Sequence, residues 1–136
     1  MTVAASAVPA DRTQSVIGVA RIIMGLSFIY YGVSKFFFIP GTIAFIGTKL
    51  PMPAAILWLS IVIEAGGGLL MVLGIKTRWI AAWFAFYCCF TAIVFHFVPE
   101  NRGLLDHFAE NIALAGGFLL LMAVGPGSFA IERERS

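Results

Sequence analysis

Four long runs of apolar residues, separated by short stretches of prolines, glycines and charges, dominate the chain. Each run holds about 18 to 25 residues, enough for a helix to cross the roughly 30 Å hydrocarbon core of a bilayer. The alternation of apolar and polar residues that marks a membrane β-strand is absent, and a backbone within lipid must satisfy its own hydrogen bonds. We therefore predict helices over about residues 15–39, 54–74, 79–98 and 107–124.

The connections between these runs predict an antiparallel, up-and-down bundle of four transmembrane helices. Residues 74–78 form a tight turn, and residues 99–106 form a short polar loop. Residues 40–53 are longer and half apolar, which favours a short segment lying in the membrane interface. Residues 1–14 and 128–136 are assigned to tails, a mobile one at the N-terminus, that flank a single transmembrane domain of residues 15–127.

Composition agrees with an all-α membrane protein. The 136 residues are 60% hydrophobic and 12% charged, about half of the roughly 25% charge typical of soluble domains. This excludes a soluble monomer, a disordered chain and a disulfide scaffold. A net charge of +2 without any Lys/Arg cluster gives no reason to expect a nucleic-acid partner. Cys88 and Cys89 are adjacent in one apolar run, a spacing that suits neither a disulfide nor a metal site.

Basic residues outside the helices predict the orientation. Because Lys and Arg concentrate on the cytoplasmic side, the side with more of them should face the cytoplasm. The side shared by both termini has the excess, so we predict a multi-pass protein of the plasma (inner) membrane with both termini in the cytoplasm. The residues counted are Arg12, Lys76, Arg78, Arg133 and Arg135 on that side, and Lys49 and Arg102 on the other.

The first helix carries two charges on a face rich in glycine. The face repeats with heptad spacing, so it should point into the bundle, and it consists of Gly18, Arg21, Gly25, Phe28, Gly32 and Lys35. A buried Arg21 needs an acceptor, since an unpaired charge within the membrane costs about 2.5–3.5 kcal/mol. A matching face on the second helix contains Ser60, Glu64, Gly67, Met71 and Gly74.

Glu64 is the carboxylate that these two faces offer to Arg21. Counted from the cytoplasmic helix ends at 1.5 Å per residue, Arg21 lies at roughly 9 Å and Glu64 at roughly 15 Å. An arginine side chain can bridge that difference, so we predict an Arg21–Glu64 ion pair. Two interpretations stay open: the pair fixes helix packing, or it takes part in function.

A second polar group gathers at the opposite side of the membrane. The chain directions put Lys35, His96, His107, Glu110 and Asn111 at similar depth. His96 could donate or accept a proton near neutral pH, whereas His107 is expected to be exposed at a helix start. Glu110 and Asn111 point about 100° apart, and Asn111 is the one expected to face inward. The spacing of the two histidines matches no metal or haem site that we recognise, so no metal site is predicted.

Taken in order, the chain resembles the DoxX family of small four-helix membrane proteins. The resemblance runs from the first helix to the end of the fourth, although residues 110 and 130–132 depart from the family pattern. The matching residues are Arg21, Gly25, Phe28, Gly32, Lys35, Gly47, Pro51, Glu64-Ala65-Gly66-Gly67-Gly68, Leu70, Gly74, Thr77, Arg78, Ala81, Ala82, His96-Phe97, Asn111, Gly116-Gly117 and Gly125-Pro126-Gly127.

The resemblance implies a membrane subunit associated with oxidoreductase activity. The family takes its name from a subunit associated with a terminal quinol oxidase and with thiosulfate:quinone oxidoreductase, and other members look like membrane partners of soluble redox enzymes. On that basis a quinone, or another small redox molecule, is expected to bind within the bundle near Arg21, Lys35, Glu64 and Asn111, with Glu64 and His96 in the catalytic roles. The cofactor stays unknown otherwise, because no haem or flavin motif is present.

Two alternatives stay open. The chain could be a non-catalytic scaffold that anchors a soluble redox enzyme on the cytoplasmic side through its charged C-terminal tail, in which case the buried charges are structural. It could also be a small proton-coupled transporter, which an intramembrane Glu64 supports, although no pair of broken helices accompanies it. Besides the lipid bilayer, a second copy of the chain is an expected partner, because four helices this apolar expose wide faces.

Overall fold

The structure, a computed structural model, describes residues 10–132 and is helical along most of that range. Four units are long and apolar enough to cross a membrane. In chain order, the elements are α1 (Ala10–Ser34) with the short 3₁₀ turn η1 (Lys35–Phe37), α2 (Ile39–Gly47), α3 (Pro53–Ile61), the π-helical turn η2 (Val62–Gly66), α4 (Gly67–Leu73), α5 (Thr77–Thr91), the π-helical turn η3 (Ala92–His96) and α6 (Arg102–Val124).

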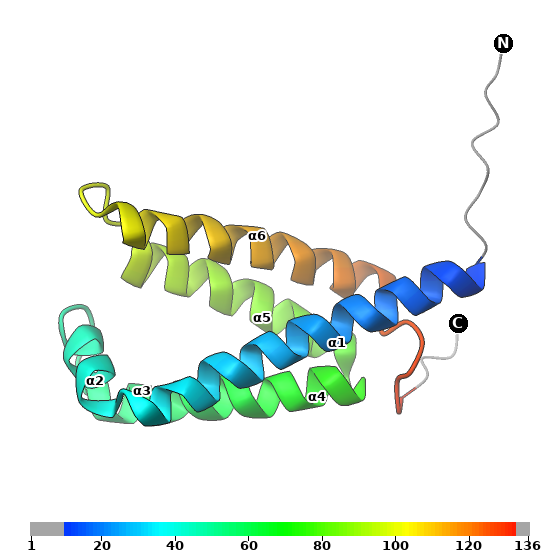
Figure 1. The fold of residues 1–136 in the computed structure, drawn as a ribbon, viewed down its shortest axis with the longest axis horizontal. Helices are drawn as coiled ribbons and strands as arrows, with labels where there is room; N and C mark the ends of the chain where they lie inside the picture. The colour runs from blue at the N-terminus through cyan, green and yellow to red at the C-terminus, as the bar shows by residue number, and fades with distance from the viewer. Residues whose placement is uncertain (1–9, 133–136) are drawn as a thin grey trace, which may run out of the picture.

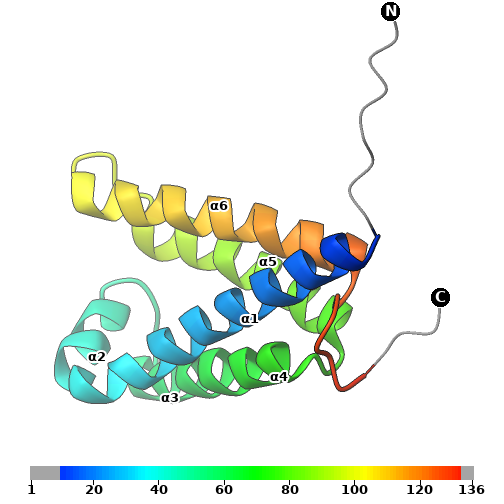
Figure 2. The ribbon, with the colours of Figure 1, turned by 45° about the vertical axis from the view of Figure 1, so that its right-hand side comes forward.

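The four membrane-crossing units alternate in direction, which confirms the predicted all-α fold (Figure 1). They form two hairpins: α1 packs along η2 and α4, and α5 packs along α6. Ala10, the α4–α5 turn and the chain after α6 lie at one end of the bundle, which we name the terminal end. The opposite end, with α2 and the loop before α6, is named the α2 end. From the α2 end toward the terminal end, the two hairpins converge (Figure 2).

Several element bounds differ from those expected from apolar runs alone. α1 begins at Ala10, so residues 10–14 are helical and the N-terminal tail assigned to residues 1–14 is too long; residues 1–9 lie outside the described range. α6 begins at Arg102, where the side chain of Asn101 accepts a hydrogen bond from the Leu104 amide at 3.1 Å. A capped polar turn extends α6 beyond its apolar part. The segment expected at the membrane interface, residues 40–53, contains all of α2 except its first residue.

Two apolar clusters hold the elements together. At the centre, aromatic rings from three helices meet: the Phe28 ring centroid lies 4.2 Å from that of Phe84 and 5.2 Å from that of Phe118. Buried side chains surround them, including Met71 and Cys88. A smaller cluster at the α2 end joins α2 to α3 and η3 through Ile46, Leu57, Ile61 and Phe95.

The glycine face of the first helix lies against the second membrane-crossing unit, as its spacing predicts. The buried residues of α1 are Gly18, Arg21, Gly25, Phe28 and Gly32. A Cβ atom on Gly25 would lie 2.8 Å from the carbonyl oxygen of Gly68, and one on Gly68 would lie 2.7 Å from the carbonyl oxygen of Gly25. Only glycine permits this backbone contact.

The chain after α6 folds back onto the terminal end instead of leaving it. The Ser128 amide donates to the Gln14 carbonyl at 2.9 Å, and the Ile131 amide donates to the Leu73 carbonyl at 2.9 Å. The Glu132 carboxylate accepts from the Lys76 amide at 2.9 Å. The tail assigned to residues 128–136 is therefore docked as far as Glu132, and residues 133–136 lie outside the described range.

The contact between Gly25 and Gly68 gives the first prediction. Gly25→Ala places a methyl group 2.8 Å from the Gly68 oxygen and 2.9 Å from the Val72 nitrogen, and overpacking of this kind costs about 1–3 kcal/mol. We expect a lower Tm for the detergent-solubilised variant, followed as loss of the monodisperse chromatographic peak on heating. Gly116→Ala is the matched control, because a Cβ there meets nothing within 4 Å. Equal Tm values for both variants would show that the two helices are not in backbone contact.

Candidate functional site

Arg21 is fully buried and binds only backbone carbonyls among the described residues. Its Nη1 donates to the carbonyls of Met71 at 2.5 Å and Val72 at 2.6 Å. Its Nε donates to the Pro126 carbonyl at 2.8 Å, and its Nη2 donates to the Ser128 carbonyl at 3.2 Å. We name this arrangement the arginine clamp. It joins α1, the last turn of α4 and the chain after α6.

The predicted Arg21–Glu64 ion pair is therefore wrong. The last four carbonyls of a helix have no partner within it, and they carry the negative end of the helix dipole. The C-terminal turn of α4 lies beside Arg21 and supplies such carbonyls. They satisfy the guanidinium at its own depth, so it has no need to extend toward Glu64.

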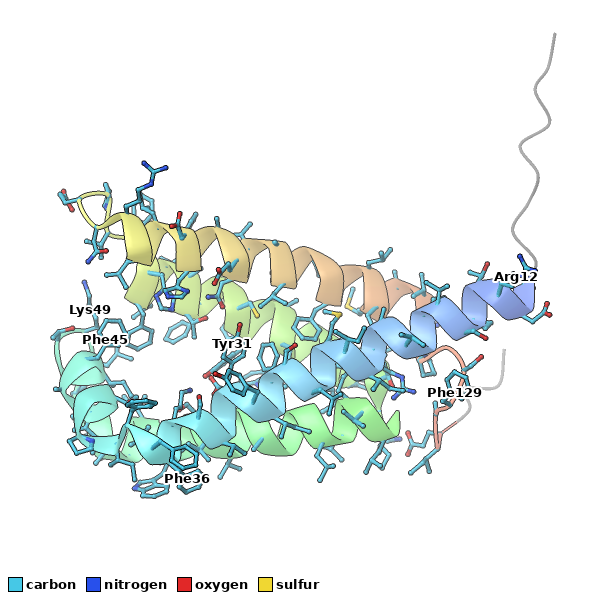
Figure 3. All side chains as sticks on the ribbon, in the orientation of Figure 1. Arg12, Tyr31, Phe36, Phe45, Lys49 and Phe129 are labelled. Atoms are coloured by element: carbon cyan, nitrogen blue, oxygen red, sulfur yellow. The ribbon has the colours of Figure 1, made fainter. Side chains whose placement is uncertain are left out.

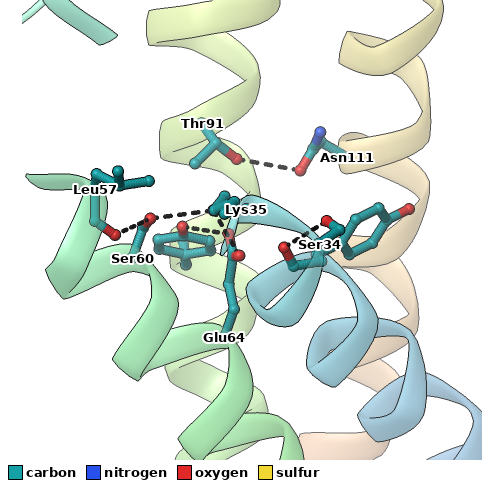
Figure 4. Close-up of polar contacts among 9 residues, drawn as sticks. Ser34, Lys35, Leu57, Ser60, Glu64, Thr91 and Asn111 are labelled. Atoms are coloured by element: carbon teal, nitrogen blue, oxygen red, sulfur yellow. Dashed lines mark hydrogen bonds and ion pairs between the residues drawn. The ribbon is translucent and has the colours of Figure 1, made fainter. Parts of the chain in front are cut away.

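Glu64 pairs instead with Lys35, one of the residues expected near the opposite side of the membrane. The Lys35 Nζ lies 2.5 Å from Glu64 Oε2 and also donates to Ser60 Oγ at 3.1 Å. The Tyr87 hydroxyl donates to Glu64 Oε1 at 2.7 Å. The Glu64 side chain is 8% exposed and that of Lys35 is 21% exposed. Figure 4 shows this group, which we name the Lys35–Glu64 cluster.

Two polar residues of the candidate site, one of them in the Lys35–Glu64 cluster, lie on π-helical turns. Glu64 is in the middle of η2, and His96 ends η3. A π turn inserts an extra residue into a helix, which rotates the helical face that follows, and such turns are frequent at functional sites. Beyond η2, Gly68 is buried, whereas Gly67, which the heptad spacing placed on the inner face, is only half-buried. The predicted face therefore differs by one position directly after η2 and holds again at Met71 and Gly74, which are both buried.

A cavity of about 590 Å³ lies between the two hairpins on the side of the α2 end. Phe28 lines it toward the central aromatic cluster, Phe45 and Leu50 line it toward α2, and the Lys35–Glu64 cluster forms part of its wall. In Figure 3, Tyr31 on α1 and Phe45 on α2 lie on two sides of this hollow. Most of the remaining lining is apolar.

The five polar residues expected at similar depth all line this one cavity: Lys35, His96, His107, Glu110 and Asn111. Asn111 accepts a hydrogen bond from the Thr91 hydroxyl at 3.1 Å and donates to the His107 carbonyl at 2.9 Å. Glu110 is largely exposed, and its carboxylate lies 2.9 Å from Nδ1 of the exposed His107. Arg21 is the one proposed ligand-binding residue that lies away from the cavity.

His96, at the end of η3, lines the cavity beside α2. Its ring stacks on Phe45 with centroids 6.3 Å apart, and its centroid lies 5.6 Å from that of His107. The His96 Nδ1 atom is buried, and it has no hydrogen-bond partner among the described residues. Because this atom has almost no accessible surface even toward the cavity, a bound molecule could reach it only if the imidazole ring turned. Within residues 10–132, no group of three or more His, Cys, Asp or Glu side chains is placed to hold a metal ion.

Tyr87 is the residue of this site that sequence reasoning missed. It belongs to the Phe-rich run of α5, which reads as lipid-facing or core, yet its hydroxyl is bound to Glu64. The sequence does carry a signal: Tyr87 is a single phenol among phenylalanines, and it lies four residues before Thr91 on the same helical face. A buried Tyr hydroxyl usually has a hydrogen-bond partner, so a Tyr at this position indicates a polar neighbour.

Comparison with known proteins identifies relatives along most of the chain. The family model described as DoxX matches residues 16–97. The inner membrane protein YphA of Escherichia coli (strain K12) is 36% identical over 124 residues, which is 85% of this chain and 87% of YphA. The inner membrane protein YqjF of the same organism is 38% identical over 117 residues, which is 85% of this chain and 88% of YqjF. No solved structure matches the chain.

The Lys35–Glu64 cluster gives the second prediction. Lys35→Met leaves Glu64 without its cation, and breaking a buried pair costs about 3–5 kcal/mol; we expect the lower end, because Lys35 is 21% exposed. Glu64→Gln should destabilise the protein as well. The double variant Lys35→Met/Glu64→Gln should recover most of the loss, because it removes both charges. Thermal unfolding of all four proteins measures this coupling, and strictly additive losses would show that the pair is not coupled.

Proposed function

The chain belongs to the DoxX family of membrane proteins, and we propose that it binds the head group of a quinone, or of a similar small redox molecule, in the cavity beside Lys35 and Glu64. In this proposal it serves as a membrane subunit associated with oxidoreductase activity. The observation that carries the proposal is a hydrogen-bonded charged pair, with a donor to spare, on the wall of a cavity whose lining is mostly apolar.

The cavity has the size and chemistry that such a ligand needs. Its volume of about 590 Å³ lies within the roughly 300–1,000 Å³ typical of small-molecule sites, which are mostly apolar with a few placed polar groups. An ammonium group has three N–H donors. Lys35 directs two of them to Glu64 and Ser60, which leaves one for a quinone carbonyl oxygen.

A second polar group faces the same space. The half-buried imidazole of His96 lines the cavity and can accept or donate a hydrogen bond, according to its protonation. Reduction of a quinone to a quinol takes up two protons and two electrons. We assign the exchange of protons to Glu64 and His96, and we expect the electrons to come from a redox enzyme bound to this subunit. Asn111 is held in place by its hydrogen bonds to Thr91 and His107. It contributes a further polar side chain to the cavity wall.

A second candidate function is that of a membrane anchor for a soluble redox enzyme. It is supported by the terminal end, where the docked chain brings Glu132 beside Lys76. In this case Lys35 and Glu64 stabilise the bundle and bind no ligand. The two candidates differ in whether the purified chain alone binds a quinone.

Direct binding of a tailless dimethoxy-methyl-benzoquinone to the purified protein tests the proposal. The variant Lys35→Met/Glu64→Gln removes the charged donor while the cavity keeps its shape. Since a hydrogen bond from a charged group contributes about 1.5–3 kcal/mol, we expect binding at least tenfold weaker. Ser27→Ala is the control, because Ser27 is bonded within α1 and does not line the cavity. Arg21→Lys, checked for folding, should also keep the affinity.

The binding measurement can contradict the proposal in two ways. If the wild-type protein binds no quinone at all, the anchor function is favoured, and capture of a soluble enzyme by the membrane-bound chain then becomes the expected result. If the double variant binds as tightly as the wild-type protein, the quinone site is not the Lys35–Glu64 cluster.

We further propose that the protein resides in the plasma (inner) membrane with the terminal end in the cytoplasm. Arg12 near the start of α1 and Lys76 and Arg78 at the α4–α5 turn lie at the terminal end, whereas Lys49 after α2 and Arg102 at the start of α6 lie at the α2 end. Arg133 and Arg135 lie outside the described residues. The basic excess marks the cytoplasmic side. A fluorescent protein fused to the C-terminus should be bright, and alkaline phosphatase fused there should be inactive. Active phosphatase would reverse the orientation.

A further inference from the structure

The cavity is open on the side where α3 faces α5. The side chains of Leu59, Trp83, Phe86 and Phe90 line the cavity, yet their exposed fractions are 58%, 48%, 59% and 39%. Side chains that both line a cavity and remain exposed form the rim of an opening. Every one of these rim residues is apolar, and we name this opening the α3–α5 rim.

The α3–α5 rim lies within the membrane-crossing part of the bundle. Its residues belong to the apolar units Pro53–Leu73 and Thr77–His96. At 1.5 Å per residue, Leu59 lies about 9 Å below the start of α3 at Pro53, and Phe90 lies about 9 Å before the end of η3 at His96. The opening therefore faces hydrocarbon and not water.

The opposite side of the cavity has a different character. Between α1 and α6, the lining residues include Tyr31, Ser34, Glu110 and Asn111, and Glu110 is 60% exposed. The exposed part of the lining is therefore polar at Glu110, between α1 and α6, and apolar at the α3–α5 rim, while Ser60, Glu64 and Tyr87 add buried or half-buried polar groups to the cavity wall. A molecule with a polar head and an apolar chain can lie in it in one orientation, with its head toward Lys35 and His96 and its chain between α3 and α5.

We propose that the α3–α5 rim is a lateral portal, through which a membrane-dissolved amphiphile with a long apolar chain enters the cavity and through which its chain protrudes when it is bound. This inference rests on the proposed function and narrows its substrate class to quinones that carry a hydrocarbon tail. The chain gains little free energy by the move, because lipid tails are as apolar as the rim. The portal therefore controls access and fit, and the head group supplies the affinity.

A steric block of the rim tests the portal. Leu59→Trp adds bulk where the tail must pass, and Leu69→Trp is the matched control, because Leu69 is a 51% exposed leucine on the same membrane-crossing unit that does not line the cavity. The probes are the tailless dimethoxy-methyl-benzoquinone and its decyl derivative, measured on the purified protein in lipid nanodiscs. We expect Leu59→Trp to weaken binding of the decyl derivative at least fivefold and to leave binding of the tailless probe unchanged. Leu69→Trp should change neither.

Photo-crosslinking locates the tail independently. A decyl-benzoquinone with a diazirine at the tail end should label peptides that contain Leu59 or Phe86, and an excess of the tailless probe should suppress that labelling. Suppressible labelling at Tyr31 or Asn111 would place the tail between α1 and α6 and overturn the portal.

The outcomes separate the portal from the quinone site itself. If the tailless probe binds and depends on Lys35 and Glu64, but Leu59→Trp leaves the decyl derivative unaffected, the portal is refuted and the proposed function stands. If neither probe binds the wild-type protein and no labelling is suppressible, both are refuted.

Discussion

The backbone contact between Gly25 and Gly68 sets the position of the charged groups in the bundle. Because α1 and α4 are antiparallel, a residue one turn before Gly25 faces a residue one turn after Gly68, which brings Arg21 to the carbonyl of Val72. By the same rule, Glu64, one turn before Gly68, faces the later part of α1. Lys35 lies beyond that level and reaches back to it. In hydrocarbon, where an unpaired charge is costly, this one register therefore assigns Arg21 to the terminal end and Glu64 to the cavity.

The sequence predicts the inner face of α1 well and the pairing of its charges poorly. Heptad spacing identifies the buried glycines and Arg21, because the helical period alone decides which residues share a face. The spacing does not give the depth of each charge in the membrane. Counting from the ends of the apolar runs places Glu64 within reach of Arg21, but the register of α1 against α4 is fixed by glycines in the middle of the helices. The true acceptors are backbone carbonyls, and a carbonyl acceptor leaves no trace in the sequence.

The grouping of Lys35, His96 and Asn111 could be predicted, because it depends only on the direction and length of each helix. The cavity that they line could not, since it arises from side-chain volumes and from how far the hairpins separate. Nor do the two π turns have a sequence signal that we recognise. They matter for the site nonetheless, because the extra residue in η2 and η3 alters the direction in which Glu64 and His96 point. Tyr87 does have a sequence signal, as the single phenol in a Phe-rich run, but its role depends on its distance to Glu64, which the sequence does not give.

The shape of the bundle explains how an open cavity persists in a membrane. The arginine clamp and the rings of Phe28, Phe84 and Phe118 hold the hairpins together from the terminal end to the centre. Toward the α2 end, Phe95 of η3 still packs against α2 and α3, but lipid exerts no hydrophobic force that would close the space between this contact and the central rings. Any space open to hydrocarbon would then be filled by an acyl chain. The Lys35–Glu64 cluster makes a purely apolar occupant unfavourable, because such an occupant leaves the spare donor of Lys35 unsatisfied. An amphiphile whose head accepts that hydrogen bond satisfies both parts of the cavity at once.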